Sequence, residues 1–237
     1  NNYRCLVDTL GTPTDTSSIS VLVVNSPPQI ISNPVDSTVC EGIDAAFMVN
    51  AGGSGLVYQW QENIGAGWVD ITATGSNPSY SNWNSDTLHV SSIIASNNGN
   101  QYRCIVSGAC PTPVTSNAAT LTVNTAPSIA WHPSASTICA GSNTTFGVSA
   151  TGTSLTYQWQ VNEGSGFTDI TSSGSNPTYS NWTSDTLHVN ATIASNNGFQ
   201  YRCVVSGTCP SPMTANAATL TVNTAPSIAS HPSAATI

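Results

Sequence analysis

Apolar and polar residues alternate along most of this chain, which is the pattern of half-buried β-strands. In residues 200–205, Tyr201, Cys203 and Val205 fall on one face of a predicted strand, and the residues between them fall on the other. An Asn-Asn-Gly turn signal precedes this strand and a polar loop follows it. No segment shows a helical period, so the chain is predicted to be all-β.

The same pattern returns along the chain at a constant step of 99 residues. The pairs that keep this step include Trp60 with Trp159, Cys104 with Cys203, and Cys110 with Cys209. A repeat of this length can bury its own core, so each full repeat is predicted to be a separate domain. Short linkers between the domains predict an extended array.

Four parts follow from this period. Residues 1–24 are predicted to be the last two strands of a preceding repeat, 25–123 and 124–222 are two full repeats, and 223–237 begin another.

The second full repeat shows the strand order of a β-sandwich. Apolar residues alternate in four further predicted strands, at Phe146, Val148 and Ala150, at Leu155, Tyr157 and Trp159, at Leu187 and Val189, and at Leu220 and Val222. A buried Trp on the third strand and a Tyr two residues before a Cys on the sixth are features of the immunoglobulin sandwich. The fold class is therefore predicted to be tandem immunoglobulin-like β-sandwiches, with a tyrosine corner leading into the sixth strand.

One departure from this pattern concerns the cysteines of the sixth strand. The second-strand position that should hold their disulfide partner is occupied by Val49 in one repeat and by Val148 in the other. We therefore predict that Cys5, Cys104 and Cys203 are free thiols buried in the core.

Several short motifs together resemble one known group of proteins. Both full repeats contain the four-residue motif Tyr-Gln-Trp-Gln and the three-residue motif Tyr-Arg-Cys. The other motifs are the segment 116–124 (SNAATLTVN) and two turns, Cys-Glu-Gly at 40–42 and Cys-Ala-Gly at 139–141. These motifs look like the tandem immunoglobulin-like repeats of very large cell-surface and secreted proteins of Bacteroidota. The resemblance implies an adhesin, gliding or matrix protein exported by the type IX secretion system.

The resemblance also implies a modification, because Bacteroidota attach O-glycans to Thr or Ser after Asp and before a small or apolar residue. Five residues match this motif: Thr9, Thr16, Ser37, Thr87 and Thr186. A three-residue motif also matches by chance.

Composition and charge exclude several classes of partner. The formal net charge is −8, the chain has no lysine, and charged residues make up 6% of it. Nucleic acid and anionic membrane surfaces both need a basic patch, so neither is expected as a partner. No apolar run reaches the length of a membrane-spanning helix, so no membrane insertion is expected. Seven cysteines at fixed places in the repeat favour an oxidising compartment, and hence an extracellular or cell-surface location.

Four cysteines remain as disulfide candidates: Cys40, Cys110, Cys139 and Cys209. They can pair within repeats, as Cys40–Cys110 and Cys139–Cys209, or across the junction as Cys40–Cys209. Standard topology places the two loops of one repeat at opposite ends, so pairing within a repeat requires the long loop at 206–216 to fold back. We favour this pairing slightly, because it accounts for all four cysteines.

The sequence suggests no catalytic, cofactor or metal site, since no Ser-His-Asp set, carboxylate pair or cluster of ligands is recognisable. We therefore expect a non-enzymatic structural segment, the stalk or filament of an exported adhesin, whose partners are the neighbouring repeats. The alternative is a carbohydrate-binding array in which Trp83 and Trp182 stack on sugar rings. Surface glycans or other cell-surface proteins would then be partners.

Overall fold

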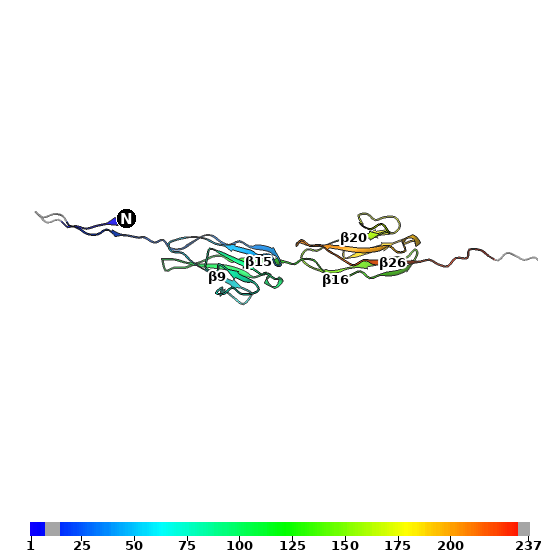
Figure 1. The fold of residues 1–237 in the computed structure, drawn as a ribbon, viewed down its shortest axis with the longest axis horizontal. Coiled ribbons are helices and arrows are strands. Elements are labelled where there is room, and N and C mark those ends of the chain that lie inside the picture. Colours follow the sequence, from blue (N-terminus) through cyan, green and yellow to red (C-terminus); the bar gives the residue numbers. More distant parts are fainter. Residues whose placement is uncertain (8–14, 232–237) are drawn as a thin grey trace, which may run out of the picture. The chain divides into compact units, whose positions relative to one another are not determined.

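A computed structural model describes residues 1–7 and 15–231 of the chain. The chain divides into two compact units, Asn1–Val123 and Asn124–Ile237, which run from blue to green and from green to red in Figure 1. The described regular structure is β-strand except for two short 3-10 helices, η1 (Ala95–Asn97) and η2 (Ala194–Asn196). The predicted all-β class is confirmed.

The first unit contains a sandwich of two sheets. In the larger sheet the strand order is β10 (Val69–Asp70), β9 (Val57–Asn63), β13 (Gln101–Ser107), β15 (Ala119–Asn124) and β6 (Ser37–Cys40), and β14 (Val114–Thr115) also pairs with β13. The smaller sheet has the order β11 (Ser79–Ser81), β12 (Thr87–Ser91) and β7 (Ala45–Met48). A separate pair joins β5 (Gln29–Ser32) to β8 (Asn50–Gly52).

The second unit repeats this topology. Its larger sheet runs β17 (Ser136–Cys139), β26 (Ala218–Asn223), β24 (Gln200–Ser206), β20 (Thr156–Asn162) and β21 (Phe167–Asp169), with β25 (Met213–Thr214) paired to β24. The smaller sheet is β18 (Thr144–Gly147), β23 (Thr186–Asn190) and β22 (Thr178–Ser180), and β16 (Ser128–Trp131) pairs with β19 (Ser149–Thr151). This is the order of an immunoglobulin-like sandwich, in which the first strand is shared between the two sheets.

Residues before the first sandwich form only short ladders. Strand β1 (Asn2–Tyr3) pairs with β4 (Ser20–Val21), and β2 (Leu6–Val7) pairs with β3 (Asp15–Thr16). Cys5 lies between β1 and β2 and is exposed. The prediction that Cys5 is a core thiol is therefore wrong, because no second sheet packs against these ladders in the described structure.

The centre of each core is a Trp beside a Cys on the neighbouring strand. Trp60 of β9 is paired in register with Cys104 of β13, and both are fully buried. The Trp60 indole Nε1 donates a hydrogen bond to the Ser85 carbonyl oxygen at 2.9 Å. In the second unit Trp159 and Cys203 repeat this arrangement. The predicted burial of both tryptophans and of the thiols Cys104 and Cys203 is found in the structure.

The expected tyrosine corner does not form. Tyr102 and Tyr201 are fully buried, but among the described residues their hydroxyls have no hydrogen-bond partner. Their rings instead pack on the second-strand phenylalanines, with a centroid distance of 4.8 Å between Phe47 and Tyr102.

The single arginine of each repeat supports the outer face of the larger sheet. The Arg103 guanidinium lies 4.2 Å from the centroid of the Trp68 ring, and its Nε donates to Gln61 Oε1 at 2.7 Å. Gln61 in turn donates to Asp70 Oδ1 at 2.7 Å. In the second repeat, Arg202 lies over the Phe167 ring and donates to Gln160. Gln160 in turn donates to Asp169. These polar residues are therefore accounted for by the fold.

The buried tryptophans predict matched losses of stability. We expect Trp159→Phe to destabilise the second unit by about 1–3 kcal/mol, because it opens a cavity and leaves the Ser184 carbonyl without its donor. Trp60→Phe should have the same effect on the first unit only. Calorimetry of the two variants measures this. Equal loss in both units from either substitution would contradict two separate cores.

Candidate functional site

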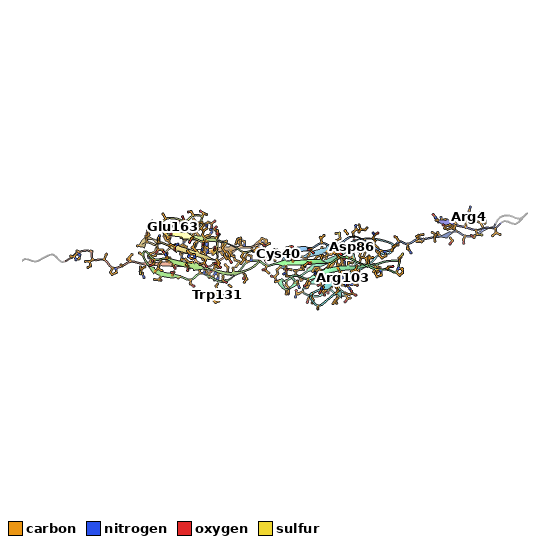
Figure 2. The ribbon with its side chains drawn as sticks, turned by 180° about the vertical axis from the view of Figure 1, so that it is seen from behind. Arg4, Cys40, Asp86, Arg103, Trp131 and Glu163 are labelled. Atoms are coloured by element: carbon orange, nitrogen blue, oxygen red, sulfur yellow. The ribbon has the colours of Figure 1, made fainter. Side chains whose placement is uncertain are left out.

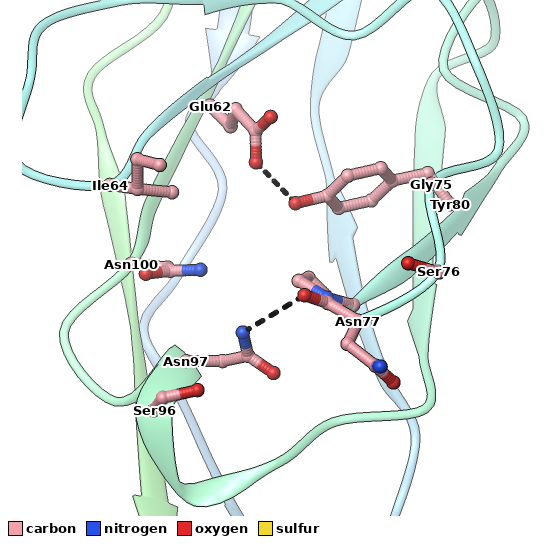
Figure 3. Close-up of a pocket in the computed structure, with 10 residues that line it drawn as sticks. Glu62, Ile64, Gly75, Ser76, Asn77, Tyr80, Ser96, Asn97 and Asn100 are labelled. Atoms are coloured by element: carbon pink, nitrogen blue, oxygen red, sulfur yellow. Dashed lines mark hydrogen bonds between the residues drawn. The ribbon is translucent and has the colours of Figure 1, made fainter.

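A polar cavity of about 430 Å³ lies in the first unit. Four segments line it: the end of β9 with the turn that follows, β11 with the turn that precedes it, helix η1, and the residue just before β13 (Figure 3). The lining residues are Glu62, Ile64, Gly75, Ser76, Asn77, Pro78, Tyr80, Ser96, Asn97 and Asn100. Its volume falls within the range of small-molecule sites in proteins.

The turn before β11 depends on a glycine. Gly75 has a φ of +63°, and a Cβ at this position would lie 2.7 Å from the Pro78 carbonyl oxygen. Any other residue would therefore push the turn apart. Glycine at position 75 thus allows the turn to hold Ser76 and Asn77 at the cavity wall.

Two asparagines form the floor of the cavity. Asn97 is 5% exposed and fixed at both ends of its amide: its Oδ1 accepts from the Ile94 backbone N–H at 2.8 Å, and its Nδ2 donates to the Asn77 carbonyl oxygen at 3.5 Å. Asn100 is 6% exposed, and its amide points into the cavity (Figure 3). Buried amides that face a cavity supply both donors and acceptors to whatever fills it.

A carboxylate and a phenol face each other across the upper wall. The Tyr80 hydroxyl donates a hydrogen bond to Glu62 Oε2 (Figure 3). Burial, together with this carboxylate, raises the pKa of Tyr80. The phenol therefore stays protonated, and Glu62 Oε1 has no hydrogen-bond partner among the described residues.

The second repeat keeps most of this wall but arranges its polar groups differently. Seven of the ten lining positions carry the same residue 99 positions later. At the other three, Val161 replaces Glu62, Glu163 replaces Ile64 and Phe199 replaces Asn100. The Tyr179 hydroxyl, the counterpart of Tyr80, is buried without a hydrogen-bond partner in the described structure. Our sequence interpretation missed this site, although comparing the two copies position by position would have flagged it.

The two tryptophans considered as sugar platforms are not exposed rings. Trp83 is half-buried and packs against the core of the first unit, and its carbonyl oxygen accepts from the Trp60 backbone N–H at 2.9 Å. Trp182 does the same in the second unit. They cover the core, as a tryptophan beside this strand often does. The exposed indole is that of Trp131 in β16, which is 75% exposed (Figure 2).

The cysteines fall into two chemical states. Cys40 and Cys209 are disulfide-bonded. Five cysteines are free: Cys5, Cys104, Cys110, Cys139 and Cys203. The two pairings favoured from the sequence, Cys40–Cys110 and Cys139–Cys209, are therefore not formed, since each would need one of the free thiols.

Geometry within a repeat explains this outcome. The Cys110 thiol lies 3.7 Å from the Asn25 carbonyl oxygen, at the end where the chain enters the repeat. Cys139 is paired in parallel register with Asn223, at the end where the chain leaves its repeat. The turn cysteine and the loop cysteine of one repeat are thus separated by the length of the sheet, and the long loop does not fold back to join them.

The five candidate glycosylation sites lie in different surroundings. Thr9 lies outside the described residues, and Thr16 is exposed in β3. Ser37 is half-buried in β6. Thr87 is half-buried, and its hydroxyl donates to Asp86 Oδ1 at 3.0 Å. Thr186 is half-buried in β23.

Residues 1–7 and 15–231 contain no group of three or more His, Cys, Asp and Glu side chains that could hold a metal ion. In the same residues, no helix has the length and apolar character needed to cross a membrane.

Comparison with known proteins shows the fold. No protein-family model matches the chain. A titin fragment, domains I67–I69 in an E-to-A variant, is similar with a TM-score of 0.62 at 17% identity, over 94% of this chain and 74% of that one. The complex of Dpr11 IG1 with DIP-gamma is similar with a TM-score of 0.58 at 15% identity, over 82% of this chain and 98% of that one. Drosophila OTK, extracellular domains 3–5, is similar with a TM-score of 0.51 at 14% identity, over 94% of this chain and 70% of that one. The chain therefore has the fold of tandem immunoglobulin-like domains.

One curated protein is similar in sequence. Endoglucanase C of Cellulomonas fimi is 33% identical over 147 residues, which are 60% of this chain and 12% of the enzyme. The match therefore spans a small part of that protein.

The buried thiols predict a clear difference in reactivity. Burial raises the pKa of Cys104 to about 12 and that of Cys203 to about 11. Because only the thiolate reacts, we expect alkylation of these two in the native protein at pH 8 to be at least about tenfold slower than that of exposed Cys139. Mass spectrometry before and after denaturation measures this, and fast native labelling of Cys104 would contradict it.

Proposed function

We propose that this chain is a structural segment, a stalk or filament, of a large exported cell-surface adhesin. The observation that carries the proposal is the duplication of everything that builds the sandwich. The buried Trp–Cys pair, the Arg–aromatic contact and the hydrogen bonds of the Gln–Asp pair recur at the same positions in both repeats. A protein selected for length keeps the domain and repeats it.

The source and the export route belong to the same proposal. The motif resemblance supports a Bacteroidota protein secreted by the type IX system, with O-glycans on exposed threonines such as Thr16. The disulfide-bonded cysteines support an extracellular location. Tandem immunoglobulin-like structures, which include the titin fragment and the Dpr11–DIP-gamma complex, are consistent with a non-catalytic role.

We also propose that a disulfide links the two repeats, between Cys40 and Cys209. The states of the seven cysteines support this pairing, since these two are bonded and the other five are free. It is the alternative across the junction that the sequence left open. Such a bond would resist separation of neighbouring domains under load.

Carbohydrate binding is a second candidate function. The polar cavity of the first unit favours it, because an array that served only as a spacer would have no need of a cavity lined by polar side chains. The name of the similar curated protein, Endoglucanase C, describes an enzyme that acts on a polysaccharide. This function would not depend on Trp83 or Trp182.

The stalk proposal predicts that length matters more than sequence. In the full-length parent protein, deletion of residues 25–222 should weaken cell adhesion, because the shorter chain no longer spans the distance to its target. Replacement of the same residues by an unrelated tandem immunoglobulin-like pair of equal length should restore it. A replacement that leaves adhesion at the level of the deletion would overturn the proposal.

The disulfide proposal predicts a specific change in thiol state. Cys40→Ser should make Cys209 available for alkylation under non-reducing conditions. The matched control, Cys139→Ser at the equivalent turn of the next repeat, should leave Cys209 protected. Peptide mapping of the unreduced protein should recover a linked Cys40–Cys209 peptide, and recovery of either cysteine linked to Cys104 or Cys203 would contradict the assignment.

A further inference from the structure

We propose that the cavity of the first repeat is a binding site for a neutral saccharide, and that Glu62 and Asn100 determine its specificity. The inference rests on the second candidate function above and assigns that function to one site in one repeat.

The fold does not require the polar residues of this cavity. The second repeat builds the same sandwich with Val161 and Phe199 in the places of Glu62 and Asn100. It even leaves the Tyr179 hydroxyl buried without the carboxylate partner that Tyr80 has. A buried amide without structural need costs stability, so the presence of Asn100 in the first repeat needs another explanation.

The shared residues of the wall are rigid. Asn97 is held through both atoms of its amide, and its counterpart Asn196 makes the same bonds in the second repeat, to the Ile193 N–H at 2.8 Å and to the Asn176 carbonyl at 3.3 Å. Both repeats therefore carry a preformed frame. Only the first repeat pairs the wall tyrosine with a carboxylate, through the Tyr80–Glu62 hydrogen bond, and places a buried amide, that of Asn100, at the cavity (Figure 3).

The chemistry of the lining selects the ligand class. Asn100 offers a donor and an acceptor, Ser76 and Ser96 offer hydroxyls, and Glu62 Oε1 offers an acceptor. A sugar hydroxyl both donates and accepts, so it can satisfy all of these groups. Pro78, Ile64 and the Tyr80 ring supply the apolar surface that the carbon-bound face of a sugar ring needs.

Other ligand classes fit less well. An anion would meet the Glu62 carboxylate in a chain with a formal net charge of −8. A metal ion would find a single carboxylate, one oxygen of which already accepts from Tyr80. A large apolar ligand would leave the buried Asn100 amide without partners.

The experiment follows backbone and Asn side-chain amide NMR signals of the isotopically labelled chain during titration with glucose, cellobiose, xylobiose, mannose and lactose. We expect at least one sugar to shift the signals of Asn97, Asn100 and residues 76–80, with a dissociation constant on the order of millimolar, as befits a small ligand. The equivalent signals at Asn196 and residues 175–179 should not move.

The second repeat provides the matched variants. Glu62→Val with Asn100→Phe introduces residues that the second repeat already accommodates, and we expect a loss of affinity of roughly tenfold or more with unchanged amide dispersion. Val161→Glu with Phe199→Asn should create binding in the second repeat.

The outcomes separate the site from the function. Shifts at the cavity that the double variant abolishes support the proposal. Sugar-dependent shifts confined to another surface, such as that around Trp131, would overturn this site while keeping carbohydrate binding. The absence of shifts with every sugar of the panel would overturn both the site and the second candidate function, and would leave the stalk proposal untouched.

Discussion

Each sandwich depends on packing around one Trp–Cys neighbour pair, because no covalent bond joins its two sheets. Cys104 is a free buried thiol, and the second-strand position opposite is the buried Val49. Trp60 fills the space between the sheets and its indole reaches the Ser85 carbonyl. The core therefore has to be closed by apolar contact alone, and its aromatic residues are the same in both repeats.

That constraint leaves the rest of the surface free to differ between repeats. The cavity shows this most clearly: its frame is common to both copies, whereas Glu62 and Asn100 occur in one and Val161 and Phe199 in the other. A repeat array can carry a local binding function in this way without changing the domain that gives it length. The structural and the carbohydrate-binding proposals are therefore compatible, since they depend on different residues.

The cysteines illustrate the same division between core and ends. Cys104 and Cys203 lie in the core and behave as small apolar side chains. The turn and loop cysteines lie at opposite ends of each sandwich, near Asn223 and Asn25 in the copies where these contacts are described. A bridge within one repeat would therefore have to span the sheet.

The sequence alone determined the fold class, the 99-residue period and the buried faces of the strands, because alternation and repetition are local properties of a chain. It could not determine that Cys5 is exposed, that Cys110 and Cys139 are free, or that Trp83 covers the core. The cavity could be predicted only in part. Comparison of the copies marks the substitutions, but Glu62 and Asn100 meet only because strand pairing brings their segments together. Tertiary structure decided these points, since alternation specifies which face a side chain occupies but not which distant segment will pack against it.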